Sequence, residues 1–324
     1  MFKDNFITIC RAHHLALKTE RSYWQSARKF ILWMGAKSAK DLERDPTGNF
    51  RRYLSQMANE NPDREEGNEG VSASTQNLAF HSVRFLYEKV LGIPIGDLSG
   101  IPRAKAHGRI VDVPPMEDAL RIVRNVPGMT GVCLRLICGT AGRLNDILRV
   151  RVKDLDFRRK LVAIQESKGG KSRLVPMPES LVAELKQLVR RREALHEQDL
   201  KEGFGWVHMP GQLAKKYPEE EKSLGWQYLF CADNRSKDPI TGKIGRTHIF
   251  DVTLQRAFLN SRRRLKIRRH YTIHGLRHAT AQFWEANGAT RSEIQKLLGH
   301  SNGATTDLYL QSGKKGLPKV TSPI

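Results

Sequence analysis

Residues able to act on phosphates concentrate near the C-terminal end of the sequence, between positions 274 and 309. His274, Arg277 and His278 are spaced so that one face of a helix would carry all of them. His300 and Tyr309 follow in the same stretch. Arginine binds phosphate oxygens with a planar set of donors, histidine exchanges protons near neutral pH, and tyrosine can form a covalent intermediate. From the residues alone, phosphate chemistry and a merely polar face of a helical domain explain this stretch equally well.

The helices that would position these residues have recognisable boundaries. Asn287 and Gly288 end the first helix, because both residue types adopt the left-handed conformation at helix ends. Thr290 opens a second helix, and Glu293, three residues later, completes a capping box. We therefore expect a helix, a tight turn, a second helix and a further turn. The polar residues would lie at the helix ends, where they can converge.

The length of 324 residues favours two domains. Residues 1–92 show helical periodicity and predict a small helical bundle. Residues 93–113 hold prolines, glycines and basic residues without helical periodicity, which indicates a basic linker. Residues 114–324 predict a second, mostly helical domain. The expected fold class is mainly α with a small antiparallel β-sheet, arranged as a helical domain followed by an α+β domain.

The small sheet is expected in the first half of the second domain. Apolar, β-prone runs predict strands over residues 149–157, 161–167 and 173–178. Lys168 and Lys171 flank a Gly-Gly pair between the last two runs, and this pattern is typical of a hairpin turn. Without further information, Lys168 would be interpreted as a solvated turn lysine.

The charge of the chain points to a polyanionic partner. There are 55 Lys and Arg residues against 34 Asp and Glu, which gives a net charge of +21 and a pI of about 10.1. DNA or RNA is the first candidate, because cationic side chains that neutralise phosphates release counterions. A merely basic protein, or one associated with ribosomes, is the alternative that charge leaves open.

The cysteines and the apolar runs exclude several classes of protein. Cys133 and Cys138 lie in an apolar helical run and are expected to be packed thiols. The histidines lack the spacing of metal ligands, so we expect no metal site. No apolar run is long enough for a membrane span, and the first residues do not resemble a signal peptide. We expect a soluble, intracellular protein.

Several separated motifs together resemble the signature of the tyrosine recombinases, or phage integrase family. His274-x-x-Arg277-His278, then Leu-Gly-His300, then Tyr309 match its C-terminal boxes. Gly142-Arg143 followed by Asp146 resembles its first arginine box, in which the acid holds the guanidinium. The resemblance implies a SAM-like DNA-binding domain at residues 1–92 and a catalytic domain at residues 114–324.

The hairpin lysine belongs to the same resemblance. Lys168 matches the catalytic hairpin lysine of the family, and Lys171 is the neighbouring candidate. We prefer Lys168, because the first lysine of such a turn usually has this role in the family. Ser167 replaces the first glycine of the usual turn, so the turn geometry here differs in detail.

The resemblance implies strand cleavage and rejoining through a 3′-phosphotyrosine. Tyr309 would attack the scissile phosphate, while Arg143 and Arg277 would bind its non-bridging oxygens. Lys168 would protonate the leaving 5′-oxygen, and His274 would accept the tyrosine proton. The other roles implied are a hydrogen bond from His300 to the phosphate and structural support of Arg277 by His278. Because the phosphotyrosine stores the bond energy, no cofactor, neither ATP nor a metal, is expected.

Residues 189–246 resemble the segment that distinguishes the integron integrases within this family. The matching phrases include MPGQLAKKYP and GWQYLF, and the insertion itself covers about residues 194–230. The resemblance implies recombination of gene cassettes at folded single-stranded attC sites and duplex attI sites, by a homotetramer on two DNA sites. It also implies a location in the bacterial cytoplasm, in association with the nucleoid. Only a short tail follows Tyr309, so docking of this tail on a neighbouring subunit stays open.

Recognition of unpaired bases needs flat side chains on which bases stack. We expect Trp226 and Tyr228 to be core residues, with base stacking as the alternative. For DNA contact we select the more polar candidates of this segment and its flank: His208, Lys215, Lys216, Tyr217 and His248. Relatives often have two adjacent histidines where this chain has Thr247 and His248, so recognition here would differ in detail.

Two other functions remain possible from the sequence. The first is a phage-type or chromosome-dimer-resolving recombinase that acts on duplex sites. The second is a DNA-binding protein with an inactive catalytic site. All six catalytic positions hold suitable residues, which argues against the second.

Overall fold

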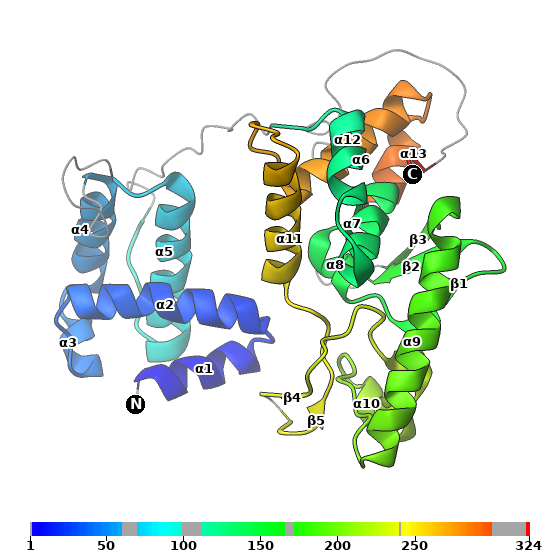
Figure 1. Ribbon diagram of the computed structural model, residues 1–324. Coiled ribbons are helices and arrows are strands. Elements are labelled where there is room, and N and C mark those ends of the chain that lie inside the picture. The colour runs from blue at the N-terminus through cyan, green and yellow to red at the C-terminus, as the bar shows by residue number, and fades with distance from the viewer. Residues whose placement is uncertain (1, 60–69, 99–111, 166–171, 240, 300–321) are drawn as a thin grey trace. The chain divides into compact units, whose positions relative to one another are not determined.

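The computed structural model describes residues 2–59, 70–98, 112–165, 172–239, 241–299 and 322–324. The chain divides into two compact units, Met1–Arg109 and Ile110–Ile324 (Figure 1). The linker predicted at residues 93–113 spans this division, and its residues 99–111 lie outside the described part. Each unit has its own hydrophobic core.

The first unit is helical. Its elements are α1 (Phe2–Ala12), α2 (Leu17–Trp33), α3 (Ala39–Glu43), α4 (Pro46–Asn59), α5 (Ala73–Phe85) and the π-helical segment η1 (Leu86–Leu91). Aromatic rings fill the core, where Phe30 contacts Phe50, Tyr53 and Tyr87 in edge-to-face geometry. Such contacts add to the stabilisation from burial, and they join α2 to α4 and to η1.

The second unit contains the remaining helices. They are α6 (Met116–Arg124), α7 (Gly128–Thr140), α8 (Leu144–Leu148), α9 (Val182–Lys201), α10 (Leu213–Lys216), α11 (Asp251–Arg264), α12 (Ile273–Ala286) and α13 (Arg291–Leu298). Short 3₁₀ turns η2 (Val152–Asp154), η3 (Glu179–Leu181), η4 (Pro218–Lys222) and η5 (Leu224–Trp226) connect them. Helix α7 is apolar on nearly all sides, so it is the buried centre against which α6, α11 and α12 pack.

The cysteines of α7 are packed thiols, as predicted. Cys133 and Cys138 are fully buried in the core of the second unit. Burial raises the pKa of Cys138 to about 12, so the thiol stays protonated at neutral pH. Thiols in this state act as small apolar residues.

The predicted antiparallel hairpin is confirmed in its strands. The sheet has the order β1 (Leu155–Asp156), β2 (Leu161–Gln165) and β3 (Ser172–Pro176), and Ala163 lies opposite Leu174. Val162 and Ile164 are fully buried, while their neighbours on β2 are more exposed. The turn residues, including Lys168 and Lys171, lie outside the described residues. A second pair, β4 (Ser236–Lys237) with β5 (Ile244–Gly245), lies after the predicted insertion.

The strand predicted over residues 149–157 is wrong for most of its length. Only Leu155–Asp156 form a strand, and the 3₁₀ turn η2 takes the place of the preceding residues. The carboxylate of Asp154 accepts a hydrogen bond from the backbone N–H of Arg151 at 2.9 Å. This local bond folds the backbone into a capped turn, and it competes with pairing to a neighbouring strand.

The boundaries predicted around α12 and α13 are confirmed. Helix α12 ends at Ala286, and Gly288 has a positive φ of 89°. Thr290 caps α13 and forms the predicted capping box with Glu293. The predicted fold class, mainly helical with a small antiparallel sheet, is also confirmed. Within the described ranges, no helix has the length and apolar character needed to cross a membrane.

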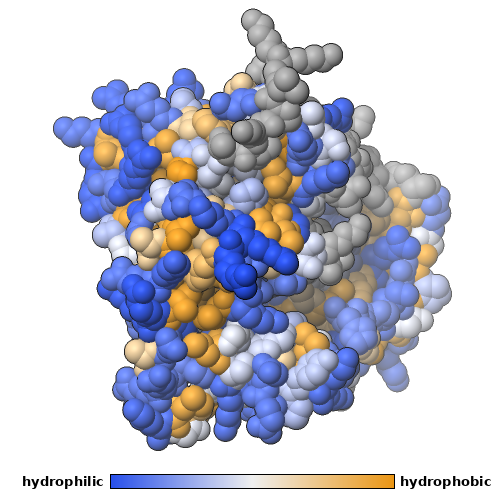
Figure 2. Space-filling model, turned by 90° about the vertical axis from the view of Figure 1, so that its right-hand side faces the viewer, coloured by the Kyte–Doolittle hydropathy of each residue, from blue (hydrophilic) through white to orange (hydrophobic). Residues whose placement is uncertain are grey.

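Hydrophilic residues dominate the face seen in Figure 2, and apolar residues appear between them in smaller groups. Single exposed apolar side chains are normal on protein surfaces.

Candidate active site

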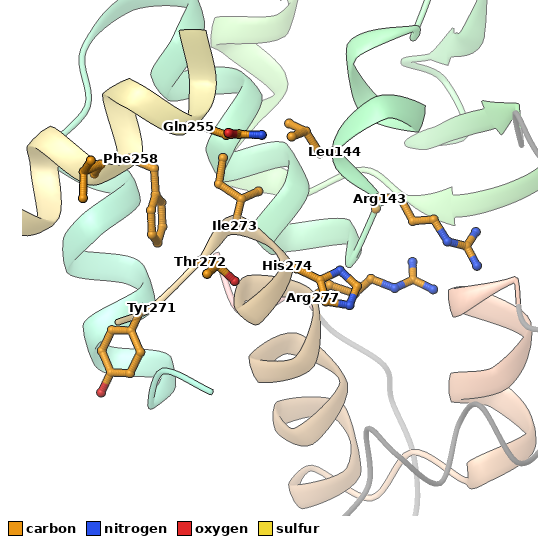
Figure 3. Close-up of a pocket in the computed structure, with 11 residues that line it drawn as sticks. Arg143, Leu144, Gln255, Phe258, Tyr271, Thr272, Ile273, His274 and Arg277 are labelled. Carbon is orange, nitrogen blue, oxygen red and sulfur yellow. The ribbon is translucent and has the colours of Figure 1, made fainter. Parts of the chain in front are cut away.

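A pocket of about 410 Å³ lies where the starts of α8 and α12 meet α11. Arg143, His274 and Arg277 extend toward the same region of this pocket (Figure 3). The other lining residues are Gly142, Leu144, Gln255, Phe258, Leu259, Tyr271, Thr272 and Ile273. The fold thus brings Arg143 close to His274 and Arg277, which follow more than 130 positions later in the sequence. The bond between Arg277 and Ala141, across 136 positions, is part of the same packing.

Arg277 is held by two backbone carbonyls. Its side chain is almost fully buried, at 1% exposure. Nη1 donates to the Ala141 carbonyl at 2.5 Å, and Nη2 donates to the Leu298 carbonyl at 2.7 Å. These bonds join α12 to the C-terminal ends of α7 and α13. They fix the plane of the guanidinium, and a guanidinium must be held in a defined plane to bind an anion through paired hydrogen bonds.

The start of α12 is fixed by local capping and by packing on α7. The Thr272 side chain accepts a hydrogen bond from the Gly275 N–H at 3.2 Å, which caps the helix. One turn past Arg277, the Thr280 hydroxyl donates to the Cys138 carbonyl of α7 at 2.5 Å. These contacts determine the rotation of α12, so His274 and Arg277 face the pocket.

Arg143 occupies the N-cap position of α8. Its Nη1 lies 3.6 Å from the Asp146 Oδ2, which is an ion pair within one turn of helix. Asp146 is buried, whereas the Arg143 side chain is 39% exposed and can reach a ligand. Gly142 lets the chain pass close to α8, because a Cβ there would stand 2.4 Å from Ile147 Cγ1.

The two histidines of α12 are held neutral near pH 7. Burial lowers the pKa of His274, and the charges of Arg277 and Arg143 lower it further. The pKa of His278 is lowered to about 4, mainly by burial and further by the charges of His274 and Arg277. The two rings meet edge to face at 5.0 Å. A neutral His274 beside the pocket can accept a proton.

Four predicted residues lie outside the described residues: Lys168, Lys171, His300 and Tyr309. The elements next to them are described. Helix α13 ends with Gly299 in a left-handed conformation, φ 67°, directly before His300. Leu298, one residue earlier, carries the carbonyl bound to Arg277. Helix α13 also packs against β3, the strand that follows the two lysines.

The residues selected for DNA contact do not line the pocket. His208 has a half-exposed side chain, with Nδ1 3.7 Å from the Asp238 Oδ2. His248 packs edge to face on Tyr228 at 5.3 Å, and burial lowers its pKa. Lys215, Lys216 and Tyr217 are exposed on and beside α10, where Tyr217 is 45% exposed.

The two aromatic residues expected in the core, Trp226 and Tyr228, differ in their burial. Tyr228 is buried, as expected, in a small cluster with Val207 and Cys231. Trp226 is only half-buried, and the Lys153 ammonium lies 3.1 Å from the centre of its ring. A cation over the face of an indole is a favourable contact.

Several lining residues were not identified from the sequence. Phe258 and Leu259 come from α11, and Tyr271 and Thr272 precede α12. Thr272 carries a usable signal, because a threonine directly before an apolar helical run is a typical N-cap. Phe258 follows Leu254 at helical spacing, which indicates burial but not a place in the pocket.

A buried ion cluster in the insertion region was also not foreseen. The Asp199 carboxylate accepts two bonds from Arg246, at 2.7 and 2.9 Å, and one from Arg235 at 2.8 Å. Arg192 lies 3.9 Å away. Burial would raise the pKa of Asp199, but the hydrogen bonds from Arg246 and Arg235 hold it below its usual value. The cluster ties the end of α9 to the segments around β4 and β5.

Among the described residues, no group of three or more His, Cys, Asp or Glu side chains could hold a metal ion. The pocket itself contributes cations and a neutral imidazole. Its chemistry therefore fits an anion that accepts hydrogen bonds, such as a phosphate diester.

Comparisons with known proteins agree on one family. The model of the phage integrase family matches residues 117–315, and that of the phage integrase N-terminal SAM-like domain matches residues 2–97. Two relatives named integrase/recombinase, from Escherichia coli and Pseudomonas aeruginosa, are each 33% identical over 96% of this chain and 89% of their own. A lambda integrase dimer bound to a COC′ core site is similar in fold, with a TM-score of 0.61 and 15% identity over 98% of this chain and 97% of that chain. The chain therefore belongs to the phage integrase family of site-specific tyrosine recombinases.

Proposed function

We propose that the protein cleaves and rejoins DNA through a 3′-phosphotyrosine, and that it recombines gene cassettes as an integron integrase. The observation that carries the cleavage chemistry is the pocket shared by Arg143, His274 and Arg277. Two guanidinium groups and a neutral imidazole match the needs of a phosphate under nucleophilic attack.

The covalent step uses Tyr309 as the nucleophile. The phenolic oxygen forms a bond to phosphorus while the bond to the 5′-oxygen breaks. A phenol has a pKa near ~10, so it needs a proton acceptor, but it leaves readily in the reverse step. In rejoining, a 5′-hydroxyl attacks the phosphotyrosine and restores the DNA strand. No ATP or metal enters this balance.

The remaining site residues have separate roles. Arg143 and Arg277 bind the non-bridging oxygens, where charge grows in the transition state. His274 accepts the tyrosine proton, and its lowered pKa keeps it ready for this role. Lys168 protonates the leaving oxygen, with Lys171 as the alternative, and His300 donates to the phosphate. Asp146 and His278 position the two arginines.

The partner is DNA, bound by a tetramer of this chain on two sites. The net charge of +21 supports a polyanionic partner. The likeness to a lambda integrase dimer on a core site supports DNA in particular. Residues 1–92 form the DNA-binding domain of this proposal, residues 93–113 its linker, and residues 114–324 the catalytic domain.

The cassette role depends on the insertion at residues 194–230. The ion cluster around Asp199 and the cluster of Val207, Tyr228 and Cys231 give this segment a packed structure of its own. Several polar or aromatic side chains remain accessible there, including His208 and Tyr217. Such a surface supports contact with unpaired bases, because bases stack on flat side chains. The DNA-contact set of this proposal is His208, Lys215, Lys216, Tyr217 and His248.

Covalent trapping tests the proposal. The protein is incubated with nicked suicide substrates made from each strand of a folded attC hairpin, and with a linear duplex. We expect a denaturation-resistant adduct on one folded strand, and its loss in Tyr309→Phe. Tyr271→Phe is the matched control, because Tyr271 also lines the pocket but its hydroxyl lies 3.5 Å from Asp118. This variant should keep the adduct.

The other outcomes are equally informative. An adduct on duplex DNA alone would replace the integron role with that of a duplex recombinase. Tight binding without any adduct would mean that the chain binds DNA but lacks the proposed chemistry. An adduct lost in Tyr271→Phe and kept in Tyr309→Phe would reassign the nucleophile.

A further inference from the structure

The pocket of the candidate active site is larger than one phosphate group requires. Its volume is about 410 Å³, and pockets of about 300–1,000 Å³ enclose whole organic ligands. Arg143, His274 and Arg277 extend toward one side of the pocket (Figure 3). The rest of the space lies between α11, the start of α8 and the segment at the start of α12, and the proposed phosphate chemistry does not use it.

This remaining space, called here the apolar annex, has mostly apolar walls. They are formed by Leu144, Phe258, Leu259, Tyr271 and Ile273. Phe258 and Ile273 are almost fully buried, at 3% and 6% exposure, so close packing fixes their positions. The Tyr271 hydroxyl lies 3.5 Å from the Asp118 Oδ2 and points away from the arginines (Figure 3). A space with aromatic and aliphatic walls suits a flat, largely apolar guest.

Gln255 supplies a polar group at the edge of the apolar annex. It precedes Phe258 and Leu259 on α11 by three and four residues, so the three side chains share one face of the helix. Its side chain extends toward Leu144 (Figure 3). Gln255 is exposed, so its amide is accessible to a ligand. A side-chain amide offers a donor and an acceptor together, which is the combination that pairs with the edge of a nucleobase.

The apolar annex begins directly beside the arginines. Ile273 adjoins His274 in the chain, and Tyr271 precedes His274 by three residues, which is a span of at most ~11 Å between their Cα atoms. A ligand that holds its phosphate between Arg143 and Arg277 could therefore extend an attached ring into the annex. A nucleotide joins a phosphate to a flat base in this way. In duplex DNA the bases of one strand are stacked at about 3.4 Å, so a base enters the annex only after it leaves the stack.

We propose that the apolar annex receives the base of one nucleotide next to the scissile phosphate, and that Gln255 binds the edge of this unstacked base. The inference rests on the proposed function, because it needs the scissile phosphate at Arg143 and Arg277. The annex contributes binding and alignment, and no bond forms or breaks in it. Unstacking costs least for a base that is already unpaired. The annex therefore favours cleavage beside an unpaired base, which a folded single strand can provide.

The fluorescence of 2-aminopurine tests the unstacking, because stacking quenches this base. Full-length Tyr309→Phe is bound to hairpins in which both bases beside the scissile phosphate are paired, and 2-aminopurine replaces each of these bases in turn. We expect the fluorescence to rise on binding at one of the two positions. A 2-aminopurine in the middle of a paired arm is the control and should stay quenched. A base that stays quenched at both flanking positions would overturn the inference.

The rate of adduct formation tests the contact with Gln255. We expect Gln255→Ala to lower the single-turnover rate about tenfold, within the range that one base contact contributes. On a substrate with an abasic site at the fluorescent position, wild type and Gln255→Ala should react at equal rates, because no base edge is left to bind. Gln198→Ala is the matched control, because Gln198 is also exposed but lies on α9 and donates to Glu202 at 2.9 Å. Its rate should stay within about twofold of wild type on both substrates.

The inference and the proposed function fail in different ways. If the wild type forms no adduct on any substrate, the proposed function fails. If the wild type forms the adduct but neither flanking base unstacks, the role of the annex alone is wrong. A loss of rate in Gln255→Ala that persists on the abasic substrate would also overturn the base contact, because the loss would then come from the pocket itself. An unchanged rate of Gln255→Ala on the intact substrate would overturn it as well.

Discussion

Two buried arginine sites of the second unit are held in opposite ways. In the candidate active site, the Nη groups of Arg277 donate to the backbone carbonyls of Ala141 and Leu298. In the ion cluster, Arg246 and Arg235 donate to the carboxylate of Asp199. Both arrangements orient guanidinium groups away from bulk water. The two bonds of Arg277 described here go to carbonyl dipoles, whereas those of Arg246 and Arg235 go to a full negative charge.

The difference explains what each site can do. A carbonyl is a dipole, so it fixes a guanidinium without cancelling its charge, and the charge stays available for a phosphate. A carboxylate neutralises its partner, so the Asp199 cluster serves as a structural joint. Removal of a residue should therefore reduce cleavage at the first site and stability at the second.

The largest expected effect is that of Arg277→Lys. Lysine keeps the charge but loses the planar pair of bonds to Ala141 and Leu298. We expect the single-turnover rate of adduct formation to fall about 10²–10³-fold. Arg235→Lys is the matched control in the ion cluster, and its rate should stay within about threefold. A rate for Arg277→Lys within tenfold of wild type would contradict the contrast between the two sites.

Asp199→Asn should destabilise the fold. It leaves Arg246 and Arg192 buried without a full countercharge from this position, which costs about 3 kcal/mol in comparable sites. Urea denaturation at fixed salt measures the free energy of unfolding. Glu202→Gln is the control, because Glu202 binds the same Arg235 but its side chain is 44% exposed, so the change should cost much less stability than Asp199→Asn. Equal losses in both variants would remove the structural role of Asp199.

Acid should weaken the active-site region through His278. The folded pKa is about 4, below the ordinary value of 6.5, so the unfolded state binds more protons between these values. The stability contribution is present above about pH 6.5 and is lost as pH falls toward 4, by up to about 3 kcal/mol. The free energy of unfolding should be measured across this range. His278→Asn should flatten the slope, and an unchanged slope would assign it to other groups.

The smallest expected effect is that of Thr280→Val, which removes the hydroxyl that joins α12 to the Cys138 carbonyl. The loss of one buried hydrogen bond costs about 1 kcal/mol, read as a lower midpoint in urea. Thr280→Ser keeps the hydroxyl and should recover the part of the loss that is due to the bond. If both variants lose the same stability, packing volume and not the bond is what joins the helices.

Local patterns were sufficient for the elements around the site. The helical period placed His274 and Arg277 on one face, and the capping box of Thr290 and Glu293 set the start of α13. These features depend on residues within one turn of each other, so a single sequence contains them. The failed strand at residues 149–157 shows the limit, because the Asp154 cap changed a β-prone run into a turn.

Long-range partners were not predictable. The carbonyls that hold Arg277 are 136 and 21 positions away, and every residue type carries a carbonyl. Asp199 pairs with arginines 36 and 47 positions away, in a chain with many other arginines. Residue types alone do not select these partners, because the choice is made when the core packs. The roles of Lys168, His300 and Tyr309 stay predictions.

Helix α7 has a consequence for engineering and for divergence among relatives. The two arginine segments are both attached to its C-terminal end, Arg143 by chain continuity and Arg277 through Ala141 and Thr280. The insertion is attached at other positions, through Asp199 at the end of α9 and through Arg151, which donates to the carbonyls of Trp226 and His208. The arginine segments and the insertion can therefore diverge in sequence at different evolutionary rates. We expect chimeras that exchange residues 202–248 between relatives to inherit the target preference of the donor and the catalytic rate of the recipient.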